Sequence, residues 1–366
     1  MSQLLDILTY AVKNAASDIH LTVGSPPAVR VDGAIRFLKG EDLTPKDTFS
    51  FLDEIMNPEQ KERFVRTGDA DLALAISGLG RFRVNVLRQR GATGIVMRYV
   101  KNKLLDFEAL NLPGAMRTIC EFKRGLVLVT GTTGSGKSTT LAAMIDRINE
   151  DQRVHIVTLE DPIEYLHTNK KSIVTQREMN IDTKDWHVAL RACMREDPDV
   201  ILIGEMRDVE TFYAAMSAAE TGHLVFSTLH TSNASMTVDR ILDLFPPNQH
   251  DQIRSQLSFQ LRGCVAQRLL PTADGKGRVP AVEVMLNNPA VAALIRDNNI
   301  KQIPLAINSG RDEGMQTFNM SIYGLLKRKL ITMEDALWAS DNPEELKMMI
   351  QGITLSQNAR GGILKR

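Results

Sequence analysis

The sequence predicts an α/β protein with a small α+β domain over residues 1–100 and a larger domain over residues 113–287 that contains a mainly parallel sheet. Strand-type segments joined by tight turns occupy much of the first region, whereas β-type and helical segments alternate beyond Leu112, as in a parallel sheet covered by helices. After Asn288 the pattern is helical, so residues 288–366 are expected to form a helical region that ends in a loose tail, "NARGGILKR". Residues 101–112 are interpreted as a linker.

The composition is that of an ordinary globular protein. The chain has 366 residues, of which 43% are hydrophobic, and its 44 basic residues equal its 44 acidic ones, so its net charge does not indicate a nucleic-acid partner. Its cysteines, Cys120, Cys193 and Cys264, form no CxxC pair, which favours a reducing compartment and buried thiols over structural zinc. No run approaches the roughly 18 apolar residues that a membrane span needs. We expect a cytoplasmic protein that meets membranes only peripherally.

The first domain is expected to open with an amphipathic helix that ends near Ala15, because apolar residues recur at helical spacing from Leu4 to Val12. Strands are then predicted in "SDIHLTV", "AVRVDG", "DADLALAIS", "GLGRFRVNVLRQRG" and "TGIVMRYV". Within the fourth of these, side-chain alternation places Phe82, Val84 and Val86 on one face and Arg81, Arg83 and Asn85 on the other. The arginine face is either a solvated surface or one that contacts a ligand.

A phosphate-binding loop is predicted in "GTTGSGKS", which has the GxxxxGK[ST] spacing and lies between a strand, Leu126 to Thr130, and a helix from Lys137 to about Ile148. Backbone N–H groups of the turn face phosphate, Lys137 reaches the β and γ groups, and Ser138 is a ligand of Mg²⁺. The predicted nucleotide-binding residues are Gly131, Thr132, Thr133, Gly134, Ser135, Gly136, Lys137, Ser138 and Thr139.

Acidic residues follow the next strand, in "RVHIVTLEDPIEY". Pro162 stops this strand and leaves Glu160, Asp161 and Glu164 at its carboxyl end, where open α/β sheets bind ligands. These carboxylates suit metal holding and water activation, although a plain polar loop is the alternative. We predict that Glu164 polarises the attacking water, with Glu160 as the competing base.

A second acidic position ends the strand Val200 to Ile203 in "DPDVILIGEMRD". Many phosphate-loop enzymes have a magnesium-side Asp at the place that Gly204 takes here. Glu205 is therefore predicted to supply the acid and to hold Mg²⁺ through its water shell.

Two histidines flank the apolar run in "ETGHLVFSTLHTSNA". If Leu224 to Leu229 is a strand, His223 and His230 are separated by about 23 Å at about 3.3 Å per residue, so one ion cannot bind both. His230 is expected at the ligand-binding end, where it can sense the γ-phosphate or contact the neighbouring carboxylates. His223 is expected at the opposite end, where a hydrogen-bonded structural histidine is the alternative to a functional one.

The segments "ASDIHL", "GTTGSGKST", "LEDPIEY", "REDPDVILIGEMRD", "ETGHLVFSTLHT" and "VAQRLL" resemble, in this order, those of the secretion and pilus-motor ATPases. The resemblance spans nearly the whole chain. It implies a PAS-like N-terminal domain, a RecA-like ATPase domain, a ring of six chains, and ATP with Mg²⁺ held between the two domains. The Asp box, an atypical Walker B segment and the His box are implied at "LEDPIEY", "ILIGE" and "GHLVFSTLH". Nucleotide contacts are implied for Arg81, Arg83 and Arg98, and sensing or coupling roles for His223, His230, Arg195 and Arg207.

Within this family the chain is most similar to the type IV pilus retraction branch, because it lacks the four-cysteine zinc segment of the extension and secretion ATPases. A helix that resembles AIRNLIRE in that branch is "AVAALIRD" here, with Ala292 and Ala293 in place of Arg and Asn. The function implied is a hexameric motor that retracts pili, with an inner-membrane platform protein as its partner and pilin subunits as indirect ones. The alternatives are an accessory or paralogous motor, an assembly or secretion ATPase, and a non-motor phosphate-loop kinase or nucleotide-gated regulator.

Overall fold

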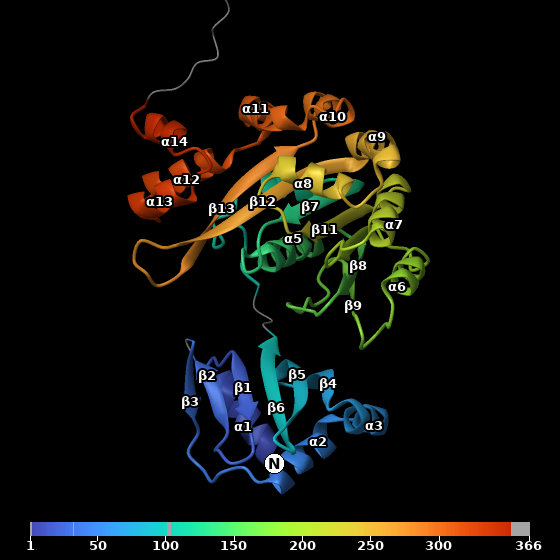
Figure 1. Ribbon diagram of the computed structural model, residues 1–366, viewed down its shortest axis with the longest axis vertical. Coiled ribbons are helices and arrows are strands. Elements are labelled where there is room, and N and C mark those ends of the chain that lie inside the picture. Colours follow the sequence, from blue (N-terminus) through green and yellow to red (C-terminus); the bar gives the residue numbers. More distant parts are fainter. Residues whose placement is uncertain (1, 32, 101–103, 353–366) are drawn as a thin grey trace, which may run out of the picture. The chain divides into compact units, whose positions relative to one another are not determined.

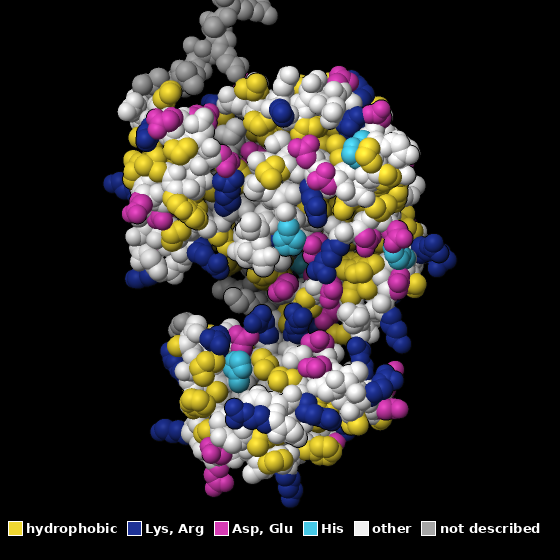
Figure 2. Space-filling view, in the orientation of Figure 1, with side chains coloured by type: hydrophobic (Ala, Val, Ile, Leu, Met, Phe, Trp, Pro, Cys, Tyr) yellow, Lys and Arg dark blue, Asp and Glu magenta, His cyan; other side chains and the backbone are white. Residues whose placement is uncertain are grey.

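The computed structural model describes residues 2–31, 33–100 and 104–352 and divides into two compact units (Figure 1). The first unit comprises the chain up to residue 103 together with Ile163–Leu166, and the second comprises the rest. Basic and acidic side chains are mixed over the visible face of each unit (Figure 2), in accord with their equal numbers in the sequence. The predicted tail "NARGGILKR" lies outside the described residues.

The first unit contains a six-stranded antiparallel sheet in the order β3-β2-β1-β6-β5-β4. The strands are β1 Asp18–Leu21, β2 Ala28–Val31, β3 Ala34–Phe37, β4 Asp69–Ile76, β5 Gly80–Gln89 and β6 Ala92–Val100. Helix α1, Gln3–Lys13, buries Leu4, Ile7 and Leu8 in the same core as β5. The predicted opening helix and the five predicted strands are confirmed, and β3 is an additional edge strand.

Two helices of the first unit, α2 Pro45–Ile55 and α3 Pro58–Thr67, were not predicted. Each begins with a capping box, in which the Thr44 and Asn57 side chains accept the N3 backbone N–H and the N3 side chain accepts the cap N–H. Each also has proline at the start of the helix, the position that tolerates it best. This local signal was present in the sequence and could have identified both helices.

The second unit contains a seven-stranded sheet in the order β13-β12-β7-β11-β10-β8-β9. Its strands are β7 Gly125–Thr130, β8 His155–Glu160, β9 Ile173–Glu178, β10 Val200–Ile203, β11 Leu224–Leu229, β12 Leu261–Pro271 and β13 Arg278–Leu286. All neighbours are parallel except β13, which is antiparallel to β12 at the sheet edge. Every residue of β7, β10 and β11 is buried, as expected for parallel strands covered on both faces. The mainly parallel sheet is confirmed.

Helices connect the parallel strands and continue beyond them. The helices up to β12 are α4 Ala115–Cys120, α5 Lys137–Asp151, α6 Trp186–Cys193, α7 Val209–Glu220, α8 Ala234–Leu242 and α9 His250–Gln260. The C-terminal helices are α10 Pro289–Arg296, α11 Ile303–Ser309, α12 Phe318–Lys327, α13 Met333–Ala339 and α14 Pro343–Ile350, which gather beside β12 and β13 (Figure 1). Phe318 and Ile322 of α12 share a buried cluster with Ala266 and Leu270 of β12. Among the described residues, no helix combines the length and apolar character needed to cross a membrane.

Candidate nucleotide-binding site

The carboxyl ends of the parallel strands place the predicted site residues along one edge of the second unit's sheet. In the sheet register, Thr130 of β7 is paired with Leu229 of β11. Ile203 of β10 is paired with Ser227 of β11 on one side and with Leu159 of β8 on the other. The segments that follow these strands begin with Gly131, His230, Gly204 and Asp161. Residues that are distant in the sequence therefore meet at this edge, as the strand order requires.

The phosphate-binding loop has the glycines that its close contacts require. Gly131 has a φ of 147°, and a Cβ there would lie 2.4 Å from the carbonyl oxygen of Gln267 and from Ser135 Oγ. Gly136 has a φ of 93°, and a Cβ there would lie 2.6 Å from Gln267 Nε2. A side chain at either position would push the loop away from β12. Glycine at both positions lets the loop turn into α5 with its backbone N–H groups at the helix N-terminus.

Lys137 is held inside this loop although it is the first residue of α5. Only 9% of it is exposed, and its Nζ donates to the carbonyl oxygens of Gly131, at 2.8 Å, and Thr132, at 3.1 Å. Burial lowers the pKa of Lys137, and the nearby Glu205 carboxylate opposes part of this shift. The amine is thus placed where phosphate oxygens bound by the loop would meet it.

Gln267 of β12 fastens the loop to the sheet and to α5. Its side chain is buried, donates from Nε2 to the Ser135 carbonyl oxygen at 2.7 Å, and accepts from Thr140 Oγ1 at 2.7 Å. No role was predicted for Gln267, although it is part of the "VAQRLL" segment. The available signal was a polar residue directly after the apolar residues Val265 and Ala266, because a buried polar side chain needs a partner.

His230 lies between Lys137 and Glu205, as expected from its place after β11. Its Nδ1 is 3.5 Å from Lys137 Nζ, and its Nε2 is 3.3 Å from Glu205 Oε1. Arg207 donates from Nε to Glu205 Oε2 at 2.9 Å. The side chains of Lys137, His230 and Glu205 therefore form a continuous series of polar contacts beside the phosphate loop. The sensing roles of His230 and Arg207 stay predictions.

The glycine before Glu205 has a steric reason. A Cβ on Gly204 would lie 3.3 Å from the carbonyl oxygen of Leu159 and 3.4 Å from Glu160 Cα in the adjacent strand. The Gly204 carbonyl also accepts a hydrogen bond from Thr228 Oγ1 at 2.7 Å. An Asp side chain at 204 would press on β8, so the acid is supplied by the next residue.

The three carboxylates at the end of β8 divide between the two compact units, and the cluster expected from the sequence stays a prediction. Glu160 accepts from Thr158 Oγ1 at 2.7 Å and from Gln176 Nε2 at 3.1 Å, whereas Asp161 is exposed. Glu164 belongs to the Ile163–Leu166 segment that groups with the first unit. Within the described part of the chain, no three His, Cys, Asp or Glu side chains are arranged to hold a metal ion. The closeness of the three carboxylates in the sequence predicted a single cluster, but the boundary between the two compact units lies between Pro162 and Ile163, inside this segment.

Comparison with known proteins identifies the family to which this site belongs. Residues 2–334 match the family described as Type II/IV secretion system protein. The chain belongs to this family.

Similar members of the secretion-system family include two pilus ATPases of Pseudomonas aeruginosa. The type IV pilus retraction ATPase PilT is 44% identical over 341 residues, which cover 93% of this chain and 99% of PilT. The type IV pilus ATPase PilU is 41% identical over 345 residues, or 94% of this chain and 90% of PilU. A crystal structure of the pilus retraction motor PilT with bound ADP is similar with a TM-score of 0.88 at 49% identity, covering 95% of this chain and all of that one (100%). These similarities confirm the fold class and the family resemblance.

The arginines that the family resemblance implicates lie on the first unit. Phe82, Val84 and Val86 of β5 are fully buried, whereas Arg83 between them is exposed, so the predicted alternation is confirmed. Arg98 of β6 is the cross-strand neighbour of Arg83 and donates from Nε to Asp18 Oδ1 at 2.7 Å.

Asp18 offsets part of the positive charge on this face of the first unit. Burial acts to raise the pKa of Asp18, but hydrogen bonds from Ser17 and Arg98 hold that pKa below its usual value. Arg98 is ion-paired with Asp18. Arg81 is half-buried, and Arg83 is exposed. The nucleotide contacts implied for Arg81, Arg83 and Arg98 stay predictions.

The remaining predicted residues of this secretion-family chain lie apart from the phosphate loop. His223 precedes β11, and its Nδ1 lies 2.8 Å from the Ala218 carbonyl oxygen and 3.2 Å from Thr221 Oγ1, which are local contacts. Arg195 is exposed in the segment between α6 and β10. The cysteines are buried, and burial raises the pKa of each thiol to about 12, as expected for interior residues: Cys120, Cys193 and Cys264.

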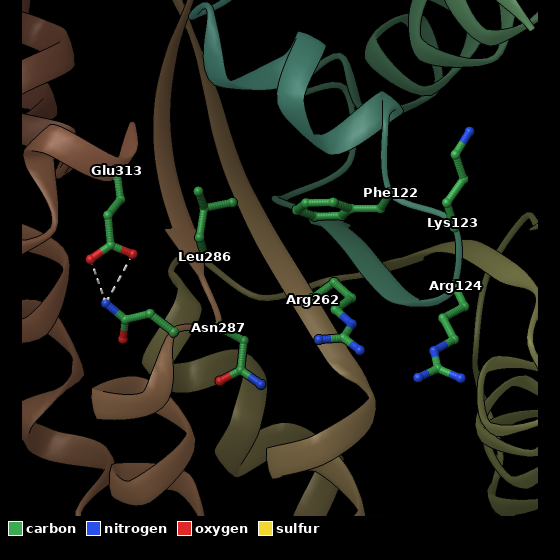
Figure 3. Close-up of a pocket in the computed structure, with 8 residues that line it drawn as sticks. Phe122, Lys123, Arg124, Arg262, Leu286, Asn287 and Glu313 are labelled. Carbon is green, nitrogen blue, oxygen red and sulfur yellow. Dashed lines mark hydrogen bonds between the residues drawn. The ribbon is translucent and has the colours of Figure 1, made fainter.

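A separate cavity of about 350 Å³ lies at the opposite end of the sheet (Figure 3). Phe122, Lys123 and Arg124 line it just before β7, with Arg262 at the start of β12. In Figure 3 the Arg124 and Arg262 side chains extend in the same direction, whereas Lys123 points away from them. Because the phosphate loop follows the other end of β7, this cavity is not part of the nucleotide site.

Proposed function

We propose that the chain is a motor ATPase that hydrolyses ATP to drive the retraction of type IV pili. The observation that supports this most directly is the contact series from Lys137 through His230 to Glu205 beside the phosphate loop. It joins a cation suited to the β and γ phosphates to an acid suited to the magnesium side of the same site. The similarity to PilT, a pilus retraction ATPase, supports the choice of pilus retraction as the work performed.

In the proposed reaction, binding and charge placement do most of the work, as is usual in phosphoryl transfer. Lys137 exchanges its contacts with the loop carbonyls for contacts with phosphate oxygens, which the loop N–H groups also bind. Mg²⁺, when bound, would neutralise phosphate charge from a position held by the exposed Ser138 hydroxyl and, through water, by Glu205. His230, in contact with both Lys137 and Glu205, would transmit the state of the nucleotide to the loop that follows β11.

Lys137→Ala tests the assignment of ATP hydrolysis. Loss of the buried amine should abolish steady-state phosphate release, because the transferred group loses its principal cation. Lys170→Ala is a matched control, since Lys170 is a lysine of the same unit that pairs with Asp146 and Glu150 on the outside of α5. Phosphate release by Lys137→Ala within twofold of wild type would contradict the proposed function.

We further propose that the motor is a homohexamer that acts from the cytoplasmic side on an inner-membrane platform protein, and through it on pilin subunits. The family resemblance of the motif set supports this assembly. An accessory role is the second candidate, because "AVAALIRD" departs from the retraction-type sequence at Ala292 and Ala293 of α10.

Deletion of the gene in its natural host, scored for piliation and twitching, separates these roles. Excess pili that do not retract would establish retraction, and bald cells would establish assembly instead. Normal pili with reduced retraction force would indicate the accessory role.

A further inference from the structure

A cavity of about 470 Å³ lies beside the phosphate loop, wholly within the second unit. One wall is the loop itself, Gly131–Ser135. The other walls are the end of β12, the exposed Arg278 at the start of β13, and the segment from Trp338 to Asp341, which comprises the end of α13 and the start of its connection to α14. Its volume falls within the range of about 300–1,000 Å³ that is typical of small-molecule sites.

Trp338 is the unusual feature of this cavity. It is 81% exposed, although it is the largest side chain of α13, and the helix instead buries Ala336 and Ala339. Single exposed apolar side chains are common on protein surfaces and need no function. Trp338 differs because it lines the same cavity as the phosphate loop and because the chain around it is held in place.

Arg268 holds that segment. Its guanidinium donates to the Ala339 carbonyl oxygen at 2.8 Å and to Asp341 Oδ1 at 2.7 Å, and it stacks over the Phe318 ring at 4.0 Å. Arg268 directly follows Gln267, the residue that fastens the phosphate loop. One stretch of β12 therefore contacts both the loop and the backbone next to Trp338, so the segment that carries the indole is held beside the phosphate loop.

We infer that Trp338 stacks against the base of the bound nucleotide, an inference that rests on the ATPase function proposed above. With the phosphates bound by the loop N–H groups, the nucleoside can extend into the adjoining cavity, where the indole offers an aromatic face. Stacking favours a purine, because a two-ring base overlaps the indole over a larger area than a pyrimidine does. Trp338 then distinguishes nucleoside triphosphates from triphosphate alone, which Lys137 and the loop do not.

Base stacking makes a defined prediction for binding. From the usual contribution of one aromatic–base stack, Trp338→Ala should weaken ATP binding between about 5-fold and about 150-fold. Its affinity for inorganic tripolyphosphate should stay within twofold of wild type, because that ligand has no base. Trp338→Phe should recover much of the ATP affinity. Phe259→Ala is the matched control, since Phe259 is also an exposed aromatic, at 64%, but lies near the end of α9 outside this cavity.

Intrinsic fluorescence gives an independent measurement, because the chain has only two tryptophans, Trp186 and Trp338. In a Trp186→Phe background, ATP should quench the remaining emission, whereas tripolyphosphate at saturation should not. ATP affinity of Trp338→Ala within twofold of wild type would overturn the inference. Equal losses for ATP and tripolyphosphate would also overturn it. A wild-type protein that binds neither ligand would overturn the proposed ATPase function as well, so the two failures are distinguishable.

Discussion

Replacement of Gln267 by methionine tests whether the contact between β12 and the phosphate loop has the importance that its geometry implies. Methionine is close to glutamine in length but cannot replace either of its hydrogen bonds. The change leaves the Ser135 carbonyl without its donor and the Thr140 hydroxyl without its acceptor. Each buried group that loses its partner costs about 1–3 kcal/mol. The Thr140 hydroxyl can turn toward a carbonyl of its own helix, which reduces its contribution to the loss of stability.

The sum for Gln267→Met is a loss of about 2–4 kcal/mol in the free energy of unfolding of the second unit, together with a higher KM for ATP. Urea unfolding followed by circular dichroism measures the first quantity, and steady-state phosphate release measures the second.

A double-mutant cycle with Thr140→Val supplies the control for the Gln267 prediction. Thr140→Val alone removes one of the two bonds and should cost about 1–2 kcal/mol. In the Gln267→Met background the same change should cost much less, because its partner is already gone. Strictly additive losses, or a Gln267→Met protein whose stability and KM both match wild type, would refute the reasoning.

Three further outcomes are expected. Glu164→Gln should bind ATP and Mg²⁺ normally but hydrolyse ATP about 10²- to 10⁴-fold more slowly; if Glu160→Gln has this phenotype instead, measured side by side, the two roles are exchanged. His230→Ala should lower phosphate release without changing metal content by elemental analysis, and loss of stoichiometric zinc or iron would contradict the contact with Lys137 and Glu205 as its role. Arg83→Ala should reduce phosphate release while the native mass of the assembled protein is unchanged, because Arg83 is exposed and outside the core; undiminished turnover in an assembled ring would leave it as a solvated surface residue.

The sequence by itself determined the parts of this protein that depend on neighbouring residues. Glycine spacing identified the phosphate loop, and side-chain alternation identified the buried and exposed faces of β5. The apolar run of β11 placed His223 and His230 at opposite ends of one strand. These features follow from local backbone geometry and periodicity, which act over a few residues. The capping boxes of α2 and α3 were equally local, so those helices could have been predicted too.

Only the tertiary structure decided which distant residues complete the site. Gln267 meets Thr140 across 127 positions of sequence, and Arg98 meets Asp18 across 80. No periodicity connects such pairs, because strand order and direction in the folded sheet determine which side chains become neighbours. The same reason explains why Glu160 and Glu164, four residues apart, were expected together although Glu164 groups with the other compact unit. The role proposed for Trp338 depends on the tertiary structure for the same reason, because only in the folded chain does this exposed side chain lie beside the phosphate loop.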